Sequence, residues 1–264
     1  MDYQNRLLAA LPRAELALLE PHLELVPLER RMVAYDAEAP ITHVYFPEEG
    51  VISVVSLMTD GSAIETATIG REGMIGLPVF HGVDVVPEQA FVQVPGRGYR
   101  MTAGAFRQVI GGCPTLQQLL HRCTVAVFTL AAQHSACNRV HSMEQRCARW
   151  LLTVHDRMPG DEFDLTQDFL SQMVGVRRAT VSEVASELQK AGLISYSRGH
   201  IIILDRAGLE RAACECYGIV RSVFARLLEG HEERSPLAGL TTSQEGMSLA
   251  GDAGSVSQSV AGEN

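Results

Sequence analysis

Eight polar side chains between residues 167 and 200 have types and spacings suited to contacts with phosphate groups and base edges. They are Gln167, Arg177, Arg178, Thr180, Ser182, Glu183, Arg198 and His200. A guanidinium group donates two parallel hydrogen bonds to guanine, and a carboxylate accepts one from cytosine N4. We therefore expect base contacts from Arg178 and Glu183, and phosphate contacts from Arg198 and from the hydroxyl and amide side chains. The local basic cluster consists of Arg177, Arg178, Arg198 and His200.

The elements that must position these side chains are two short helices joined by a glycine and followed by a hairpin. In LTQDFLSQMVGVRRATVSEVASELQKAGLI, Ser171 is the small residue where two steeply packed helices approach, and Gly175 is the turn glycine. The apolar contact positions are Leu170, Val174, Val176, Val181 and Val184. Thr166 is placed to cap the first helix, and Gly192 to end the second. The pattern predicts a helix-turn-helix whose wing is the hairpin LISYSRGHIIILD.

The outer row of the second helix distinguishes DNA binding from an ordinary helical hairpin inside a core. Its residues are all polar, namely Arg178, Ser182, Glu183, Ser186 and Gln189. A helix in a major groove uses such a row, whereas a core hairpin leaves it unexplained. The net charge of −9 does not oppose DNA binding, because residues 164–211 hold 6 basic and 6 acidic side chains. Phosphate attraction acts within about 8–10 Å, so we expect weak non-specific binding and a dependence on dimerisation.

The rest of the chain divides into a helical start, a strand-rich region, two helices and a polar tail. Residues 1–20 predict one short helix, and β-rich runs separated by turns at PEEG, TDGS, IGREG and PGRG follow from Leu25 to about Tyr99. From residue 114, apolar residues at alternating steps of four and three predict a helix with a seam. The seam consists of Leu116, Leu120, Cys123, Val127, Leu130, His134 and Cys137. MEQRCARWLLTVHDR predicts the next helix, 207–228 the last one, and 231–264 a disordered tail.

In this order and at this size, the β region, the seam helix and the winged helix-turn-helix resemble the family of the cyclic-AMP receptor protein and the fumarate–nitrate reductase regulator, the Crp/Fnr family. The resemblance covers about residues 25–217 and is most specific in VGVRRATVSEVASELQKAGLI, with further matches in HVYFPEEGVISVV and around Arg198-Gly199. It implies an α+β fold that begins with an N-terminal helix (1–20) and a cyclic-nucleotide-binding-like sensor domain (21–113), which is a β-roll or jelly roll. A dimerisation helix (114–141) and a winged helix-turn-helix DNA-binding domain (142–230) follow, and the tail (231–264) comes last. It also implies a homodimer on a palindromic site of double-stranded DNA, and contact with RNA polymerase if the protein is an activator.

The recognition helix departs in part from the pattern of that family. Arg178 and Thr180 match its first arginine and its threonine. Arg177, Ala179 and Glu183 stand in place of its serine, glutamate and second arginine. We therefore do not expect the best-known operator of the family.

The sensor region departs further. The resemblance implies a glycine turn for the phosphate, a glutamate for the ribose and an arginine that neutralises the phosphate. Gly73 and Gly76 keep the turn, but Leu77 stands in place of the glutamate, and Glu88-Gln89 lie near the place of the arginine. The candidate effector pocket consists of Arg71, Gly73, Gly76, Glu88 and Gln89, with Arg71 as a substitute cation from another direction. Because a phosphate loses its strongest hydrogen bonds without a cationic partner, we expect no cyclic AMP effector and leave the effector unknown.

The cysteines predict no metal site and no cofactor. The chain has 6 dispersed cysteines, and on a single helix Cys214 and Cys216 would point to different faces. For the seam thiols, packing is the favoured interpretation. The alternative is a redox-responsive or metal-responsive dimer contact, with a Cys137–Cys137 or Cys123–Cys123 cross-link between the two chains.

No nucleophile elbow, HExxH, Walker loop or dinucleotide fingerprint occurs, so we predict that the chain is not an enzyme. No apolar run approaches the roughly 20 residues of a membrane span, and the first residues lack the pattern of a signal peptide. The predicted location is the cytoplasm, without a membrane partner. The predicted function is sequence-specific DNA-binding transcription regulation as a homodimer. The alternative is a ligand-binding or interaction module of the same fold that has lost DNA binding.

Overall fold

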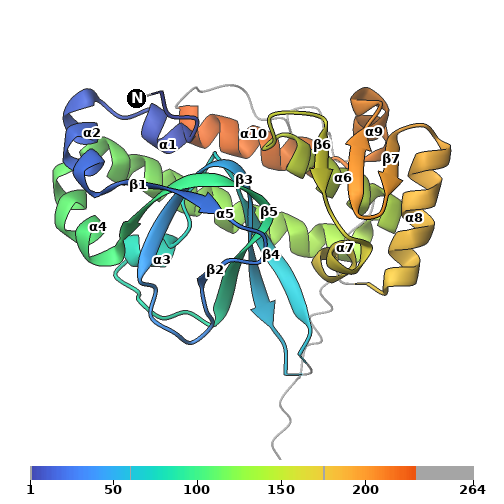
Figure 1. The fold of residues 1–264 in the computed structure, drawn as a ribbon, viewed down its shortest axis with the longest axis horizontal. Coiled ribbons are helices and arrows are strands. Elements are labelled where there is room, and N and C mark those ends of the chain that lie inside the picture. Colours follow the sequence, from blue (N-terminus) through green and yellow to red (C-terminus); the bar gives the residue numbers. More distant parts are fainter. Residues whose placement is uncertain (1, 60, 175, 230–264) are drawn as a thin grey trace, which may run out of the picture. The chain divides into compact units, whose positions relative to one another are not determined.

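A five-stranded antiparallel sheet occupies the first half of the chain (Figure 1). The computed structural model describes residues 2–59, 61–174 and 176–229, and the tail predicted over 231–264 lies outside the described residues. The strands lie in the order β1-β5-β3-β4, and β2 pairs with β5. Their bounds are β1 (Glu24–Leu28), β2 (Val33–Tyr35), β3 (His43–Leu57), β4 (Ala63–Ile69) and β5 (Glu88–Thr102).

The turns predicted at PEEG and PGRG are instead irregularities inside two long strands. β3 runs through PEEG and β5 through PGRG, and their register shifts three times between Pro47 and Ile52. Gly50 has a φ of +92°, and a Cβ on Gly96 would lie 2.2 Å from the carbonyl oxygen of Glu49. These glycines let two backbones approach closely at a bulge, and the local sequence pattern does not distinguish a bulge from a turn.

The single helix predicted over residues 1–20 is broken in the structure. Its parts are α1 (Arg6–Ala9), α2 (Arg13–Leu19) and the 3₁₀ turn η1 (Glu20–His22). The Asn5 side chain caps α1 by accepting hydrogen bonds from the backbone N–H groups of Leu7 and Leu8. Pro12 stands at the N-cap of α2. Because proline has no N–H and restricts the residue before it, one helix does not continue through this position.

The long helix predicted from residue 114 is α5 (Pro114–Val140). Three short elements lie between β4 and α5, namely α3 (Leu77–Phe80), α4 (Ala103–Val109) and the 3₁₀ turn η2 (Ile110–Gly112). One face of α5 belongs to the hydrophobic core of the sheet, which contains Phe46, Ile52, Phe106, Leu116 and Leu120. Within the described ranges, no helix combines the length and the hydropathy that a membrane crossing requires.

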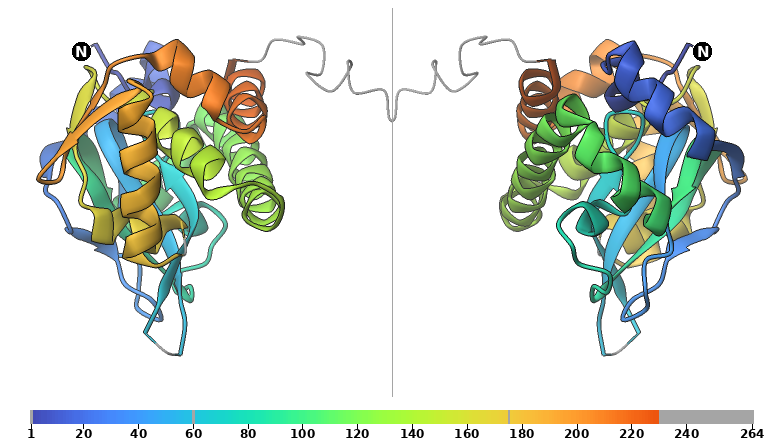
Figure 2. Two further views of the ribbon diagram at one scale, coloured as in Figure 1. Left: turned by 90° about the vertical axis from the view of Figure 1, so that its right-hand side faces the viewer. Right: turned by 90° about the vertical axis from the view of Figure 1, so that its left-hand side faces the viewer.

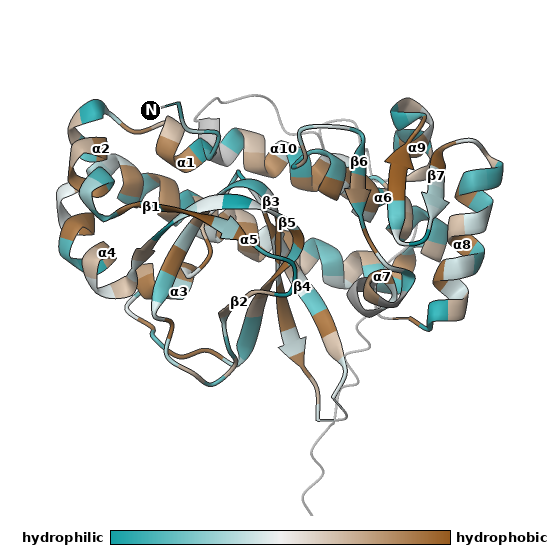
Figure 3. Cartoon of the chain, in the orientation of Figure 1, coloured by the Kyte–Doolittle hydropathy of each residue, from teal (hydrophilic) through white to brown (hydrophobic). Residues whose placement is uncertain are grey.

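The winged helix-turn-helix follows α6 (Met143–His155), which begins with a capping box between Ser142 and Gln145. Its elements are β6 (Glu162–Asp164), α7 (Gln167–Val174), α8 (Arg178–Lys190), β7 (Ile194–Ser197) and β8 (His200–Ile203), and its three strands lie in the order β6-β8-β7. Figure 3 shows β8 as hydrophobic along most of its length, in agreement with the burial of Ile201 and Ile203. The predicted helices and wing are therefore present.

The core of the winged helix-turn-helix is continuous with side chains of the five-stranded sheet. Trp150 of α6 belongs to the same hydrophobic cluster as Val51 and Val55 of β3. The rings of Phe91 on β5 and Phe169 on α7 meet edge to face, with their centroids 5.7 Å apart. Apolar burial therefore joins the sheet to the DNA-binding half within the described residues.

The last helix, predicted over residues 207–228, is also broken in two. Asp205 caps α9 (Arg206–Ala212), and α10 (Cys216–Glu229) runs beside α5 (Figure 2). Between them, Ala213 is extended, with φ −75° and ψ 157°. Neither glycine nor proline marks this break in the sequence, so the apolar pattern predicted one continuous helix.

Candidate DNA-binding surface and sensor cavity

The first residues of α8 present the predicted base-contacting side chains to solvent. Arg177 is the N-cap residue and Arg178 the first residue of the helix, and both side chains are exposed, as is Glu183. The opposite face of α8 is anchored by Val181 and Leu188, which are buried in the core. Thr180 is half-buried, whereas Ser186 and Gln189 are exposed. The polar row predicted from the sequence is thus an outer face of the helix.

Hydrogen bonds fix the angle between α7 and α8. The Ser182 hydroxyl donates to Oε1 of Gln167 over 2.6 Å, which joins two predicted phosphate contacts to each other. The Thr166 hydroxyl accepts from the backbone N–H of Phe169, which confirms the predicted cap. The interior positions Leu170, Ser171, Val181 and Val184 are buried, and Val176 is half-buried. Gly175 and the side chain of Val174 lie outside the described residues.

The wing is a two-residue turn between β7 and β8. Arg198 has a φ of +51° and Gly199 a φ of +84°, which is the backbone geometry of the turn type favoured in tight hairpins. The Arg198 side chain is exposed at the tip. The Gln189 side chain accepts from the backbone N–H of Tyr196 over 2.7 Å and so joins the end of α8 to the wing. The sequence pattern places Gln189 in the outer row, and its contact with the wing depends on the tertiary fold.

His200 differs from the other predicted phosphate contacts because two carboxylates hold it. Its Nδ1 lies 2.8 Å from Oδ1 of Asp164, and its Nε2 lies 3.4 Å from Oε2 of Glu162. The hydrogen bond with Asp164, followed by the one with Glu162, raises the pKa of His200 above its ordinary value. Its charge is therefore offset within β6 and β8, and the wing offers Arg198 as its stronger phosphate donor.

A cavity of 560 Å³ lies between the sheet and α5 and contains part of the predicted effector pocket. Among the described residues that line it, no lysine or arginine occurs, and the ionisable side chains are Tyr35, His81 and Glu88. Gly76 and Glu88 of the predicted pocket line this cavity, and so does Leu77. Burial, and then the charge of Glu88, raises the pKa of Tyr35. The cavity is thus mainly apolar, and its acidic residue disfavours a phosphate.

Arg71, Gly73 and Gln89 do not line that cavity. The Arg71 guanidinium donates to the backbone carbonyl of Asp156 over 2.8 Å, and the Gln89 amide donates to Asp36. Gly73 is buried. The proposal that Arg71 replaces the missing phosphate partner is therefore corrected, because its side chain points to α6 and away from the sheet cavity.

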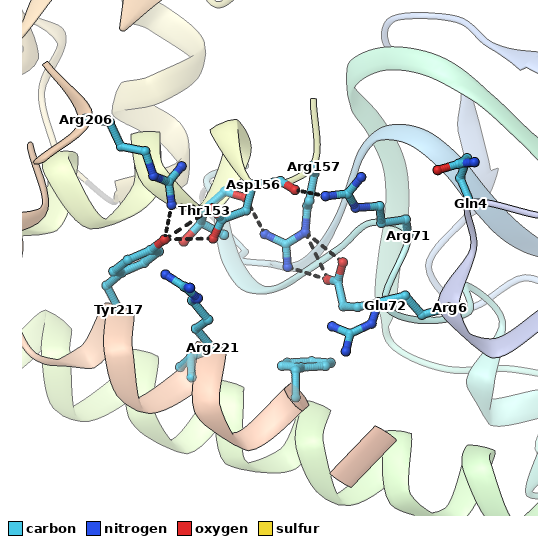
Figure 4. Close-up of a pocket in the computed structure, with 12 residues that line it drawn as sticks. Gln4, Arg6, Arg71, Glu72, Thr153, Asp156, Arg157, Arg206, Tyr217 and Arg221 are labelled. Atoms are coloured by element: carbon cyan, nitrogen blue, oxygen red, sulfur yellow. Dashed lines mark hydrogen bonds and ion pairs between the residues drawn. The ribbon is translucent and has the colours of Figure 1, made fainter. Parts of the chain in front are cut away.

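Arg71 lies instead in a second hollow, of 500 Å³, between the sheet and the DNA-binding half (Figure 4). Its lining includes Arg6, Arg71, Arg157, Arg206 and Arg221. Arg157 forms a buried ion pair with Glu72, while Arg206 and the Tyr217 hydroxyl both donate to Asp156. Burial works to raise the pKa of Glu72, but the charge and hydrogen bonds of Arg157 hold that pKa below its ordinary value. These contacts tie the segment after β4 to α6 and α10.

A second buried polar contact joins β4 to α6. The Trp150 indole N–H donates to Oε1 of Glu65 over 3.2 Å, and the Ser53 hydroxyl donates to Oε2 over 2.7 Å. Burial raises the pKa of Glu65 to about 7, although both hydrogen bonds and nearby Arg149 and Arg157 act in the opposite direction. In the sequence pattern, Glu65 has the place of an ordinary polar residue in a strand, so its buried contacts are not predictable from the pattern.

The seam predicted along α5 faces the interior of the same chain. Six of its residues, Leu116, Leu120, Cys123, Leu130, His134 and Cys137, are buried, and Val127 is half-buried. The His134 ring accepts from Arg149 over 2.7 Å, and burial followed by the charge of Arg149 lowers its pKa to about 3. Cys123 lies in the core, where burial raises its pKa to about 12. The heptad pattern therefore marks the inner face of α5, which corrects the predicted dimer seam. Burial within one chain favours the packing interpretation of Cys123 and Cys137 over the alternative of cross-links between two chains.

Comparisons with known proteins agree with the architecture. A model of the Crp-like helix-turn-helix domain matches residues 145–212. The chain is 28% identical over 186 residues to the transcriptional regulator LdrP of Thermus thermophilus, and the match covers 64% of this chain and 87% of LdrP. The structure of FixK2 from Bradyrhizobium japonicum matches with a TM-score of 0.61 at 17% identity, over 73% of this chain and 98% of that chain. The structure of a transcriptional regulator of the CRP/FNR family from Thermus thermophilus matches with a TM-score of 0.56 at 20% identity, over 72% of this chain and 98% of that chain.

The matched domain and the fold define the class of protein as a transcription regulator with a helix-turn-helix DNA-binding domain. The curated relatives of the chain are regulators rather than enzymes. More narrowly, its architecture is that of Crp/Fnr-type regulators, with an antiparallel sheet in its N-terminal half and the Crp-like helix-turn-helix domain in its C-terminal half. The predicted fold class is confirmed, and the predicted resemblance to the Crp/Fnr family agrees with these comparisons.

Proposed function

We propose that the chain is a homodimeric regulator that binds a palindromic DNA site, with α8 of each protomer in a major groove. The observation that carries this proposal is the outer row of α8, which begins with exposed Arg178 and continues to exposed Glu183, while the opposite face is buried. Symmetric half-sites would lie one helical turn apart, about 34 Å. Arg198 at the wing tip is suited to the flanking phosphate backbone. We place this activity in the cytoplasm, with RNA polymerase as a further partner if the protein activates transcription.

For the dimer we propose the outer face of α5 in place of the buried seam. The side chains of Val125 and Phe128 are 53% and 75% exposed, and Ala132 and Ala136 continue the same face with small side chains. Their spacings of three and four residues follow one stripe of a helix. A large exposed aromatic beside small residues is suited to close packing between two copies of α5.

For the effector we propose a molecule other than a cyclic nucleotide. The cavity under the sheet has an apolar lining with Glu88 as its acidic group, and lysine and arginine are absent from its described lining. A cyclic nucleotide would leave its phosphate without the charge-assisted hydrogen bonds that hold such groups. An apolar molecule fits this lining better.

Selection of bound fragments from genomic DNA by the purified full-length protein tests the DNA proposal. We expect enrichment of fragments that share an inverted repeat, and a footprint of two symmetric halves. Gel-shift titration of an enriched fragment then gives its affinity relative to a scrambled sequence. Equal binding of both sequences at all salt concentrations would favour the alternative, a module of this fold that has lost specific DNA binding.

A further inference from the structure

Four potential metal ligands meet where α5 ends and where α9 gives way to α10. Cys137 is on the last turn of α5, and His141 is its C-cap residue. Cys214 lies in the break before α10, and Cys216 is the first residue of α10. Their ligand atoms all lie within 4.8 Å of one another. The prediction that Cys214 and Cys216 face different directions is wrong, because they do not lie on one continuous helix. The extended backbone at Ala213 instead brings both thiols to Cys137.

The spacing of these atoms fits a tetrahedral ion. Sγ of Cys137 lies 3.6 Å from Sγ of Cys214, and Sγ of Cys216 lies 3.6 Å from Nδ1 of His141. Bonds of about 2.3 Å to sulfur and 2.0–2.1 Å to nitrogen give tetrahedral edges of about 3.8 Å between sulfurs and about 3.5 Å between sulfur and nitrogen. Three cysteines with one histidine form a ligand set common in closed zinc sites.

Neighbouring side chains orient the ligands as the surroundings of a zinc site do. Nε2 of His141 lies 3.1 Å from Oε1 of Glu215, which directs the Nε2 proton to the carboxylate and leaves Nδ1 facing Cys216. A carboxylate–histidine pair of this kind holds the ring and increases the basicity of the ligating nitrogen. The Gln133 amide donates to Sγ of Cys216 over 3.0 Å, a bond that a thiolate accepts well.

The surroundings also separate this cluster from ordinary packing. All three cysteines are buried at 4% exposure or less, yet they form a cluster of their own apart from the two hydrophobic cores. Arg146 and Arg149 are buried residues of α6, the helix whose N-cap residue directly follows His141. Three thiolates with one divalent ion would carry a net charge of −1, and a nearby buried guanidinium favours such a charge.

We propose that Cys137, His141, Cys214 and Cys216 bind one zinc ion that fastens the end of α5 to the start of α10. Binding exchanges thiol protons for the metal, and no electrons are transferred. His141 directly precedes Ser142, the N-cap of α6, so the ion would hold the point where α5 meets the DNA-binding half. This zinc proposal is independent of which DNA sequence the protein recognises.

Metal analysis of the full-length protein, purified without chelator under reducing conditions, tests the proposal. We expect one zinc ion per chain, and loss of that zinc in Cys214→Ala and Cys216→Ala. The matched control is Cys147→Ala, which removes another buried thiol, on α6, and should keep the zinc. Full zinc occupancy in both Cys214→Ala and Cys216→Ala would overturn the proposal.

A second measurement avoids variants that fail to fold. The metal-free wild-type chain is titrated with Co²⁺, which reports tetrahedral thiolate coordination through its visible absorption bands. We expect those bands to saturate at one equivalent and to disappear when zinc is added. Absence of the bands, or mass-spectrometric detection of a Cys137–Cys214 disulfide in a chain that binds no metal under reducing conditions, would overturn the proposal.

Discussion

The outer face of α8 and the cavity beneath the sheet differ in what they offer to a phosphate. α8 begins with two exposed arginines, Arg177 and Arg178, whereas the described lining of the cavity contains Glu88 and no lysine or arginine. A DNA backbone and a cyclic nucleotide require similar cationic partners. The start of α8 therefore offers a phosphate the cationic partners that the described lining of the cavity lacks.

Phe128 of α5 lines the cavity and is also exposed on the outer face proposed for the dimer contact. Phe128→Glu should place a charge in the proposed dimer contact and convert the dimer to monomer. Since two linked DNA-binding modules exceed one by about 100-fold to 10,000-fold in overall affinity, binding to the palindromic site should fall within that range. Light scattering and gel-shift titration measure both effects.

Leu25→Glu is the matched control, because Leu25 is an apolar residue of β1 that is 52% exposed. It should leave both the mass and the DNA affinity unchanged. A dimeric Phe128→Glu chain with normal DNA affinity would contradict the proposed dimer contact.

Glu65 tests the contact between the sheet and α6. Its pKa of about 7 lies above its ordinary value of 4.5, so the folded chain retains a proton that the unfolded chain releases. This contribution to stability is fully present below pH 4.5 and is lost as the pH rises through about 7. Glu65→Gln keeps a neutral acceptor for Trp150 and should be more stable than the wild type by about 2–3 kcal/mol at pH 8, with little difference at pH 4.5.

Urea unfolding of both chains at the two pH values measures that difference. Glu29→Gln, which changes an exposed carboxylate, serves as the control and should show no such pH dependence. If Glu65→Gln and the wild type differ by the same amount at both pH values, the Glu65 carboxyl is not held protonated by burial.

The addition of a cyclic nucleotide should have the smallest effect of these experiments on DNA binding. Titration of cyclic AMP or cyclic GMP into the protein should produce no saturable heat and no change in DNA affinity, because the described lining has no cation for the phosphate. Glu88→Gln, which removes the acidic group without adding a cation, should behave in the same way. Micromolar binding of either nucleotide to the wild type would remove the difference between the two phosphate environments.

The sequence predicts best where local pattern and tertiary packing agree. The helix-turn-helix has both apolar spacing and capping residues, and Thr166 and Gly192 indeed mark the ends of its helices. The start of α5 at residue 114 was predicted because the strand pattern stops there and the apolar seam begins. The side of α5 that faces a partner was predicted wrongly, because a stripe buried within the chain and a stripe buried in a dimer have the same spacing. In the structure, the sheet and α10 cover the stripe that contains Cys123.

Long-range packing explains what the sequence concealed. The extended residue Ala213 breaks the last helix without glycine or proline, so the meeting of Cys137 with Cys214 and Cys216 was not visible in the spacing. The contact between Arg71 and the Asp156 carbonyl could not be predicted for the same reason, since it depends on how α6 packs beside the segment after β4. Contacts between distant segments are set by the whole fold rather than by any window of sequence.

The most direct test of α8 as the DNA-reading element compares Arg178→Ala with Arg13→Ala on the site selected from genomic DNA. Both changes remove one exposed arginine, but Arg13 lies on α2. Arg178→Ala should weaken specific binding by about 1–3 kcal/mol and relax the sequence preference at one position of each half-site, while Arg13→Ala should leave both unchanged. Equal affinity and equal sequence preference for Arg178→Ala and the wild type would contradict the assignment of α8 to base recognition.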